Sequence, residues 1–249
     1  MSLQRKKLRM SSKIAFIDAD FLVYSVGFTT EEDSEHIAKA RLTEWLENFV
    51  YVRLQCDDYV AWITGKGNFR YDLAKTVPYK GNRKDAKKPK HYEALRNHLV
   101  KRHEAIETTG YEADDAVGMA LTENPEAIIC HVDKDLDQLP GKHFNPNKDL
   151  EYEVTEFEGL RNFYTQLLTG DRVDNIQGLM GIGPKKAEKA LQECTTENEL
   201  MDAVWKMYQD KNESWERLLE NGRLLFLWRF DQQKWSPPSS WLAANGKST

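Results

Sequence analysis

Acidic residues recur in four tight groups along the chain, at spacings that are unusual for a protein surface. The groups lie in FIDAD, GYEADD, VDKDLD and TGDRVD, and their candidate metal ligands are Asp18, Glu112, Asp114, Asp115, Asp133, Asp135, Asp171 and Asp174. Like charges this close repel, and a bound cation offsets that repulsion better than a helix dipole can. Mg²⁺ prefers oxygen ligands, and two ions roughly 4 Å apart can assist hydrolysis of a phosphodiester. The groups therefore predict a centre for two or more Mg²⁺ ions, with Mn²⁺ as a substitute.

Each group also has an ordinary explanation when it is taken alone. An aspartate after a strand is often a turn former, and acids are common at the start of a helix. The prediction of a functional site therefore depends on the joint pattern, because crowded acids are typical of functional sites. Asp20 and Asp137, by their positions, are interpreted as secondary or structural.

The net charge of −5 conceals a strongly basic stretch. Residues 75–102 hold ten basic residues and two acidic ones, interleaved with Tyr79 and Tyr92. A solvated face is the usual fate of such a run. One-signed charge with aromatic rings instead favours contact with a nucleic-acid backbone and its bases.

Three short apolar runs, at 13–20, 59–64 and 127–132, are predicted to be strands, and helical periodicity fits 35–52, 92–107 and 113–121. Alternation of the two predicts a parallel α/β sheet, with functional groups at the carboxyl ends of its strands. The later part of the chain is predicted to be helical at 156–169, 185–192, 197–209 and 215–229. The last stretch, 232–249, contains prolines and serines and is expected to be loosely ordered.

The segment 171–191 has the features of a phosphate-binding hairpin. Gly178, Gly181 and Gly183 surround a turn, and a proline follows at a position that suits the start of a helix. Helix N-termini attract anions, and Lys185 and Lys186 add positive charge. The segment is therefore predicted to hold duplex DNA by its backbone, without reading the bases.

Several classes of protein are disfavoured. No apolar run approaches the roughly 20 residues that a membrane span needs. Residues 1–12 lack the apolar region of a secretory signal and are interpreted as a flexible leader. Cys56, Cys130 and Cys194 are far apart and odd in number, which argues against a disulfide framework or a zinc site. A cytoplasmic protein fits best.

Five motifs occur in a specific order: FIDADFLVYS, FRYDLAKTVPYKGNRK, GYEADD, VDKDLDQL and LTGDRVDNIQGLMGIGPKKA. Together they resemble the flap endonuclease and 5′-nuclease family, in particular phage 5′-exonucleases and the 5′-nuclease domain of bacterial DNA polymerase I. The resemblance covers about residues 13–229. It implies a PIN-like α/β nuclease core at 13–154 with a basic arch at about 75–103. It also implies a helix-three-turn-helix DNA-binding region at 155–231, followed by a tail at 232–249.

The resemblance assigns roles to individual residues. A first metal site is expected from acids matching Asp18, Glu112, Asp114 and Asp133, and a second from those matching Asp115, Asp135, Asp171 and Asp174. Lys80 and Arg83 match basic residues that engage the scissile phosphate. The expected DNA-binding residues are Arg70, Tyr79, Lys84, Gly181, Gly183, Lys185 and Lys186.

The implied activity is that of a structure-selective, metal-dependent 5′-3′ exonuclease or flap endonuclease that cuts DNA by a two-metal mechanism. A role in phage DNA replication or primer removal is expected, with duplex ends, nicks or 5′ flaps as substrates and RNA:DNA hybrids as possible ones. The protein is expected to be a monomer.

One position departs from the family pattern. After the strand YVAWIT the family usually carries an aspartate, whereas this chain has Thr64 before Gly65 and Lys66. A neutral hydroxyl cannot supply the same charge, so the first site is expected to bind Mg²⁺ more weakly, to hold it through a water, or to recruit Asp20. The basic segment also looks short for a full arch.

Two other functions stay open from the sequence. The Asp-x-Asp of FIDADF fits a haloacid-dehalogenase-like phosphatase with Asp18 as its covalent nucleophile, although such an enzyme needs no DNA hairpin. A catalytically silent DNA-binding protein is favoured slightly by Thr64. Cleavage assays on p-nitrophenyl phosphate and on labelled DNA distinguish these alternatives.

Overall fold

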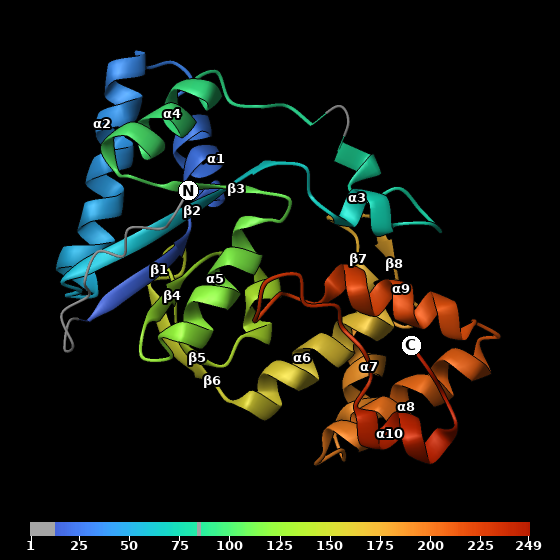
Figure 1. Ribbon diagram of the computed structural model, residues 1–249. Coiled ribbons are helices and arrows are strands. Elements are labelled where there is room, and N and C mark those ends of the chain that lie inside the picture. The colour runs from blue at the N-terminus through green and yellow to red at the C-terminus, as the bar shows by residue number, and fades with distance from the viewer. Residues whose placement is uncertain (1–12, 84–85) are drawn as a thin grey trace.

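The computed structural model describes residues 13–83 and 86–249 of the chain. The expected leader at 1–12 and Lys84 lie outside the described residues. A six-stranded sheet in the order β3-β2-β1-β4-β5-β6 forms the centre of the fold (Figure 1). Its strands are β1 (Ile14–Asp18), β2 (Asp58–Lys66), β3 (Ile106–Thr109), β4 (Ile128–Cys130), β5 (Gly141–Asn145) and β6 (Leu150–Val154). All neighbours are parallel except β5 and β6. The predicted, mainly parallel α/β sheet is confirmed.

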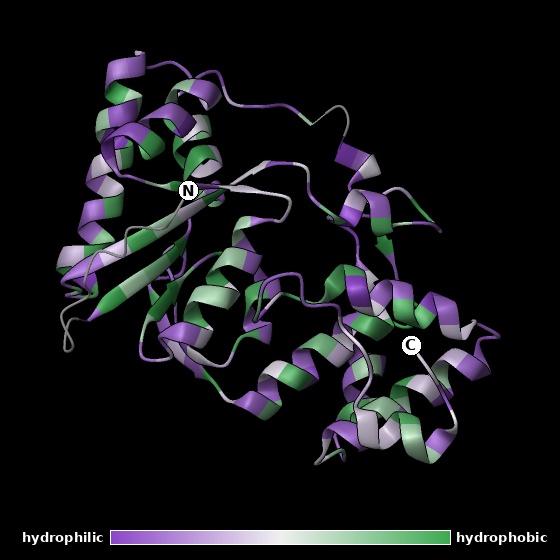
Figure 2. Ribbon diagram, in the orientation of Figure 1, coloured by the Kyte–Doolittle hydropathy of each residue, from purple (hydrophilic) through white to green (hydrophobic). Residues whose placement is uncertain are grey.

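Alternating residues of β1 build two separate hydrophobic layers on the sheet. Ala15 and Ile17 pack into a cluster with α1 (Asp20–Thr29), α2 (Glu35–Glu47) and α4 (Tyr92–Arg102). Ile14 and Phe16 point the other way, into a cluster with α5 (Ala113–Glu123). In Figure 2 apolar residues concentrate on the central strands and on the helix sides that face them. A parallel sheet needs this cover on both faces.

The helices of the carboxyl-terminal part form a third hydrophobic cluster. They are α6 (Glu156–Thr169), α7 (Pro184–Leu191), α8 (Glu197–Asp210), α9 (Trp215–Leu225) and α10 (Ser239–Asn245). Thr155 and Thr196 begin α6 and α8 with capping boxes that pair with Glu158 and Glu199. These boxes satisfy the free N–H groups of a helix start, which explains why both starts were predicted correctly.

The expectation of a loosely ordered tail at 232–249 is wrong. Trp235 and Trp241 are 5% and 2% exposed and belong to the helical cluster. The indole of Trp241 also donates a hydrogen bond to Asp202, at 2.6 Å. Large aromatic side chains bury much apolar surface, and here they outweigh the local preference of Pro237 and Pro238 for an irregular chain.

Other element boundaries were also missed. The predicted helix 92–107 ends at Arg102, and its last residues belong to β3. The predicted helix 35–52, by contrast, agrees in extent with α2 and the π-helix η1 (Asn48–Arg53), and only the helix type of its last residues differs. β5 and β6 were not predicted, and β6 forms the antiparallel edge of the sheet.

The segment between β2 and α4 connects the two parts of the molecule. It contains α3 (Arg70–Leu73), which contacts α9, and the short 3₁₀ turn η2 (Gly81–Arg83). It then passes to α4, which packs against α1 and α2. Figure 1 shows this connection spanning from the helical region to the opposite side of the sheet.

The topology places the ends of β1 and β4 side by side. The chain runs from β1 outward to β2 and β3, then returns to the other flank of β1 as β4. The carboxyl ends of strands at such a reversal are the usual position of a site in an open α/β sheet. No helix among the described residues is long and apolar enough to cross a membrane.

Candidate active site

The acidic groups converge at the carboxyl ends of β1 and β4. Asp18 is the last residue of β1 and is 8% exposed, while Asp133 follows β4 and begins the 3₁₀ turn η3 (Lys134–Gln138). Burial, together with the charges of Asp20 and Asp133, raises the pKa of Asp18 well above its ordinary value. Glu112 adds to the same effect. Asp18 and Asp133 lie at the same edge of the sheet, because β1 and β4 are neighbouring parallel strands.

The start of α5 contributes the next two carboxylates. Glu112 is the N-cap residue and Asp114 lies in the first turn of the helix. Burial, reinforced by the charges of Glu112 and Asp18, raises the pKa of Asp114 well above its ordinary value. The charges of Asp18, Glu112 and Asp133 thus all act on Asp114 or on one another, and the role of the four acids as a first metal site stays a prediction.

A second group of carboxylates adjoins the first. Burial and the neighbouring Asp133 raise the pKa of Asp135 to about 7. The charges of Asp171 and Asp174 also act on Asp135, and a carboxylate oxygen of Asp171 accepts from the backbone N–H of Asp174 at 3.0 Å. Asp171 is positioned by the hairpin of β7 (Gly170–Asp171) and β8 (Ile176–Gln177), which follows α6.

Lys134 ties this second group together and was missed in the sequence. Its ammonium contacts Asp171 at 2.6 Å and Asp135 at 3.3 Å. Burial favours the neutral form of Asp171, but Lys134 and the backbone N–H groups of Asp174 and Val173 together outweigh burial and lower the pKa of Asp171. A lysine inside the acidic motif VDKDLD was the available signal.

Lys80 and Arg83 reach the carboxylates from the connecting segment. Lys80 forms an ion pair with Glu112 and lies 3.7 Å from Asp174. Arg83 donates to Asp174 at 2.8 Å. Burial favours the neutral form of Glu112, but Lys80 and Arg70 outweigh burial, so the pKa of Glu112 is below its ordinary value. Both basic residues thus lie at the edge of the acidic cluster, as the motif YKGNRK implied.

Tyr79 does not present a ring for stacking on DNA, contrary to expectation. It is 3% exposed, and its hydroxyl lies 2.7 Å from an oxygen of Glu112 and 2.5 Å from an oxygen of Asp174, so its single proton serves both carboxylates. A ring in this position is inaccessible to a base. Tyr79 therefore orients the carboxylates of Glu112 and Asp174 and does not contact DNA, so its prediction as a DNA-binding residue is wrong.

Arg70 and Asp115 are also corrected by the structure. They are 1% and 0% exposed and form a two-pronged ion pair at 2.6 and 2.9 Å. The remaining capacity of Asp115 is used by the backbone N–H groups of Glu112 and Trp228. Arg70 cannot reach a DNA backbone, and the oxygens of Asp115 are already saturated. The pair instead fixes the start of α5, which carries Glu112 and Asp114.

The structure shows what surrounds the unusual Thr64. Its hydroxyl accepts a hydrogen bond from the N–H of Ala113, at 3.0 Å, and its own N–H donates to the carboxylate of Asp20, at 3.1 Å. Asp20 therefore lies beside the position where the family carries an aspartate. Arg96 approaches Asp20 at 3.4 Å and offsets part of its charge.

Comparison with known proteins supports the architecture. The DNA polymerase I of Bacillus caldotenax is 30% identical over 220 residues, which are 78% of this chain and 25% of the polymerase. The DNA polymerase I of Rhizobium leguminosarum is 35% identical over 119 residues, or 43% of this chain and 12% of the polymerase. The chain therefore spans a quarter or less of the length of these relatives. No protein-family profile matches it.

Two solved structures resemble the chain along most of its length. The 5′-exonuclease of bacteriophage T5 with bound zinc has a TM-score of 0.62 at 17% identity, covering 86% of this chain and 89% of that one. The chain adopts the 5′-nuclease fold. The catalytic core of Rad2 in complex with a DNA substrate has a TM-score of 0.50 at 13% identity, covering 94% of this chain and 85% of that one. The 5′-nuclease fold replaces the dehalogenase-like alternative that the Asp-x-Asp motif had left open.

The glycine-rich loop between α6 and α7 is open to solvent in this 5′-nuclease fold. Gly181 has a φ of +76°, and a Cβ added at Gly181 or Gly183 would meet nothing within 4 Å. Gly183 caps α7 and Pro184 is its first residue. Lys185 and Lys186 are exposed beside this helix start. The exposed lysines can therefore approach an anion from outside, although the ammonium of Lys186 donates to the carbonyl of Gly181 at 2.8 Å and the N–H groups of Lys186 and Ala187 donate to that of Gly183.

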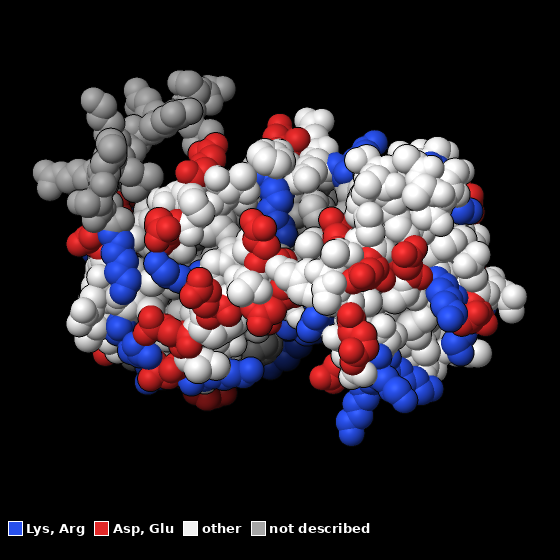
Figure 3. All heavy atoms as spheres, turned by 90° about the horizontal axis from the view of Figure 1, so that it is seen from below, with Lys and Arg blue, Asp and Glu red and all other residues white. Residues whose placement is uncertain are grey.

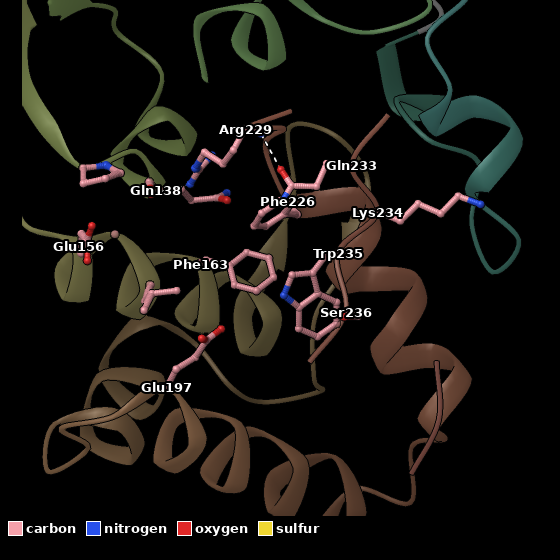
Figure 4. Close-up of a pocket in the computed structure, with 13 residues that line it drawn as sticks. Gln138, Glu156, Phe163, Glu197, Phe226, Arg229, Gln233, Lys234, Trp235 and Ser236 are labelled. Atoms are coloured by element: carbon pink, nitrogen blue, oxygen red, sulfur yellow. Dashed lines mark hydrogen bonds between the residues drawn. The ribbon is translucent and has the colours of Figure 1, made fainter. Parts of the chain in front are cut away.

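A separate hollow lies away from the acidic cluster of the 5′-nuclease fold. It has a volume of about 410 Å³, and Phe163, Phe226 and Trp235 line it between α6 and the carboxyl-terminal segment (Figure 4). The cluster carboxylates at the strand ends do not line it. This hollow therefore has no part in the candidate active site.

Charge is distributed unevenly over the surface. On the face shown in Figure 3, acidic and basic side chains form small interspersed groups. The net charge of −5 therefore does not predict the charge of a particular face of the molecule. The acids of the candidate active site include buried ones, such as Asp18 and Glu112.

Proposed function

We propose that the chain is a divalent-metal-dependent, structure-selective 5′-nuclease that hydrolyses phosphodiester bonds of DNA. The observation that carries the proposal is the convergence of acids from four separate motifs at the carboxyl ends of β1 and β4, with Lys80 and Arg83 beside them. The T5 and Rad2 structures of the same fold, which were solved with metal ions and with DNA substrate respectively, agree with this chemistry. A role in phage DNA replication or primer removal, as a cytoplasmic monomer, belongs to the same proposal.

We propose that the carboxylates of the cluster hold two Mg²⁺ ions. The proposed ligands are Asp18, Glu112, Asp114, Asp133, Asp135, Asp171 and Asp174. Their oxygens are the donors that Mg²⁺ prefers. Burial and mutual repulsion raise the pKa of Asp18 and Asp114, so the protein alone leaves their negative charge incompletely balanced. Bound by these carboxylates, Mg²⁺ would supply Lewis acidity toward the phosphodiester and the attacking water.

The protein's own cations act on the substrate phosphate. Lys80 and Arg83 are held by Glu112 and Asp174, so their charges are already oriented before DNA binds. Attack on a phosphodiester increases the charge on the non-bridging oxygens, and pre-oriented cations stabilise that state more than the ground state. The hydroxyl of Tyr79 lies within hydrogen-bonding distance of Glu112 and of Asp174 and so helps to hold the two acids beside Lys80 and Arg83.

We further propose that Asp20 compensates for the neutral Thr64. We expect Asp20→Asn to increase the Mg²⁺ concentration needed for half-maximal cleavage by about tenfold, a typical effect of removing a residue that supports a metal ligand. Thr64→Asp in the same variant should restore most of the loss, because it returns a carboxylate to the adjacent position. Cleavage rates over a Mg²⁺ titration measure both effects.

The matched control for this prediction is Asp57→Asn, which removes an exposed carboxylate just before the amino end of β2. That variant should keep the wild-type Mg²⁺ requirement. If Asp20→Asn also keeps it, compensation by Asp20 is excluded.

The glycine-rich loop is proposed to hold the duplex through its phosphates, in a helix-three-turn-helix arrangement. We expect Lys185→Ala with Lys186→Ala to weaken binding about equally for unrelated sequences, because backbone contacts carry no base information. Each lost phosphate contact should reduce the slope of log affinity against log salt by about 0.9. Fluorescence anisotropy at several salt concentrations measures the slope.

Lys142→Ala is the control, since Lys142 lies at the amino end of β5 and pairs with Glu126. It should leave the slope unchanged. An unchanged slope in the double variant would remove this loop from the DNA-binding surface.

The proposed activity is tested by digesting a 5′-flap, a nicked duplex, a blunt duplex and an RNA:DNA hybrid side by side in Mg²⁺, with mapping of the products. We expect cleavage near the 5′ end or flap junction. DNA binding without cleavage would support a catalytically silent binder, for which Thr64 is the favouring observation. Hydrolysis of p-nitrophenyl phosphate without DNA cleavage would instead indicate a phosphatase.

A further inference from the structure

Two buried histidines, His131 and His143, contact the carbonyls of the residues that cap the two ends of η3. His131 follows β4 and His143 lies within β5, and each is 1% exposed. Their facing ring nitrogens, Nε2 of His131 and Nδ1 of His143, are 2.8 Å apart. The outward nitrogens face backbone carbonyls: Nδ1 of His131 contacts the oxygen of Asp133 at 2.5 Å, and Nε2 of His143 contacts that of Leu139 at 2.9 Å.

These carbonyls determine which ring nitrogens carry protons. A carbonyl oxygen only accepts, so the nitrogen that faces it must be an N–H donor. In neutral imidazoles the other nitrogen of each ring then carries a lone pair. The two lone pairs of His131 and His143 therefore point at each other across 2.8 Å, an arrangement that a positive species between them would stabilise. The hydroxyl of Tyr152 lies 3.3 Å from the same nitrogen of His131, so it also borders this point.

A third donor faces the same point. Oδ1 of Asp137 lies 3.8 Å from Nε2 of His131 and 4.0 Å from Nδ1 of His143. Tyr152, which is paired with His143 across β5 and β6, donates its hydroxyl to that oxygen at 2.6 Å. If a proton lay between the rings, the carboxylate of Asp137 would still be too far from either histidine nitrogen to form a hydrogen bond. An ion at the centre would use all three donors.

We propose that His131, His143 and Asp137 form a second metal site, separate from the carboxylate centre, that takes a divalent cation of the zinc class. A tetrahedral Zn²⁺ with bonds of about 2.0–2.1 Å needs ligand separations of about 3.3 Å, within several tenths of an ångström of those observed. Imidazole nitrogens suit zinc-class ions, whereas Mg²⁺ prefers oxygen alone. The carbonyl contacts are the outer partners that ligating histidines typically have.

The surroundings give the ion a path and a role. A hollow of about 260 Å³ beside His131, Asp137 and Tyr152 leads to the site, and it can also supply a water as fourth ligand. The ion would join β4, β5 and η3. The turn η3 carries Asp135 and is capped by Asp133, so the site braces the turn that positions both carboxylates. This bracing is independent of which reaction the carboxylates perform.

The test is calorimetric titration of Zn²⁺ into the metal-free full chain in the presence of excess Mg²⁺, which occupies the carboxylate centre. We expect one Zn²⁺ per chain that Mg²⁺ does not displace, together with a rise in melting temperature. His143→Gln should weaken this binding by about 100-fold or more, since loss of a mere outer partner already costs 10–100-fold. Asp137→Asn should also weaken Zn²⁺ binding. Because this side chain is partly exposed and the asparagine can keep the contact with Tyr152, this variant should fold even if His143→Gln does not.

His98→Gln is the matched control, because His98 pairs with Thr43 at a distant helix and should leave Zn²⁺ affinity unchanged. The proposal is overturned if Mg²⁺ displaces all bound Zn²⁺, since the ion then belongs to the carboxylate centre. It is equally overturned if no Zn²⁺ binds and nitrogen NMR shows a proton held between the two rings. Retention of wild-type affinity by both Asp137→Asn and His143→Gln has the same consequence.

Discussion

Asp133→Asn is expected to slow DNA cleavage by about 10³-fold or more while leaving DNA affinity equal or higher. The substitution loses the charge that a metal ligand supplies, and metal-based stabilisation of the transition state amounts to several kcal/mol. It keeps the shape of the side chain and an oxygen for the N–H of Asp135, which Asp133 accepts at 3.0 Å. Removal of a negative charge also reduces repulsion of phosphate. Single-turnover cleavage and anisotropy measure the two quantities.

Asp58→Asn is the control for this substitution, because Asp58 begins β2 at the opposite end of the sheet. Its cleavage rate should match the wild type. Near wild-type turnover of Asp133→Asn in Mg²⁺ would show that Asp133 is not a metal ligand.

Lys80→Ala and Arg83→Ala are each expected to slow the chemical step by about 10²-fold, comparable to removing one pre-oriented electrostatic donor. Both side chains contact the carboxylates that we assign to metal binding. Because their effect is on the transition state, saturating enzyme should not restore the rate. Single-turnover cleavage with enzyme in large excess over DNA is the appropriate measurement.

Lys88→Ala is the matched control from the same basic segment. Lys88 is 58% exposed and lies over the ring of Tyr92, far from any cluster carboxylate contact that the structure shows. It should affect cleavage little at saturating enzyme. Recovery of the wild-type rate by both Lys80→Ala and Arg83→Ala under these conditions would mean that the two residues contribute affinity alone.

The acidic cluster was predictable because the end of a predicted strand fixes where its last side chain lies in the sheet. Apolar runs that stop at Asp18 and just before Asp133 place both carboxylates at one edge of a parallel sheet, whatever the details of the helices. The start of α5 was equally visible, because GYEADD precedes an apolar helical pattern. These features are local, and a short window of sequence contains them.

The roles of Arg70, Tyr79 and Asp115 were not predictable from local sequence. Arginine and tyrosine in a basic stretch suggest contact with DNA, whereas the structure buries both against acids that lie more than 30 positions away. Arg70 also donates to the carbonyl of Leu224, which lies in α9. Such pairing depends on how α3, α5 and α9 pack against one another. The periodicity of the sequence does not predict that packing.

The antiparallel edge of the sheet was missed for a related reason. β5 and β6 are short, and their sequences GKHFN and LEYEV have few apolar residues in a row. Pairing of His143 with Tyr152 becomes visible only once the strands are aligned. The same alignment brings His143 next to His131 and Asp137, so no short window of sequence contains the histidine site.

The most direct test of the carboxylate centre is the initial rate of 5′-flap cleavage as Mg²⁺ is added to metal-free protein under single-turnover conditions. We predict no cleavage without metal and, at low Mg²⁺, a rate that rises with an order approaching about two, as a two-ion mechanism requires. Cleavage should be confined to the region of the flap junction. Cleavage that persists in excess chelator, or bound DNA that stays intact at every Mg²⁺ and Mn²⁺ concentration, would contradict the proposed metal-dependent nuclease.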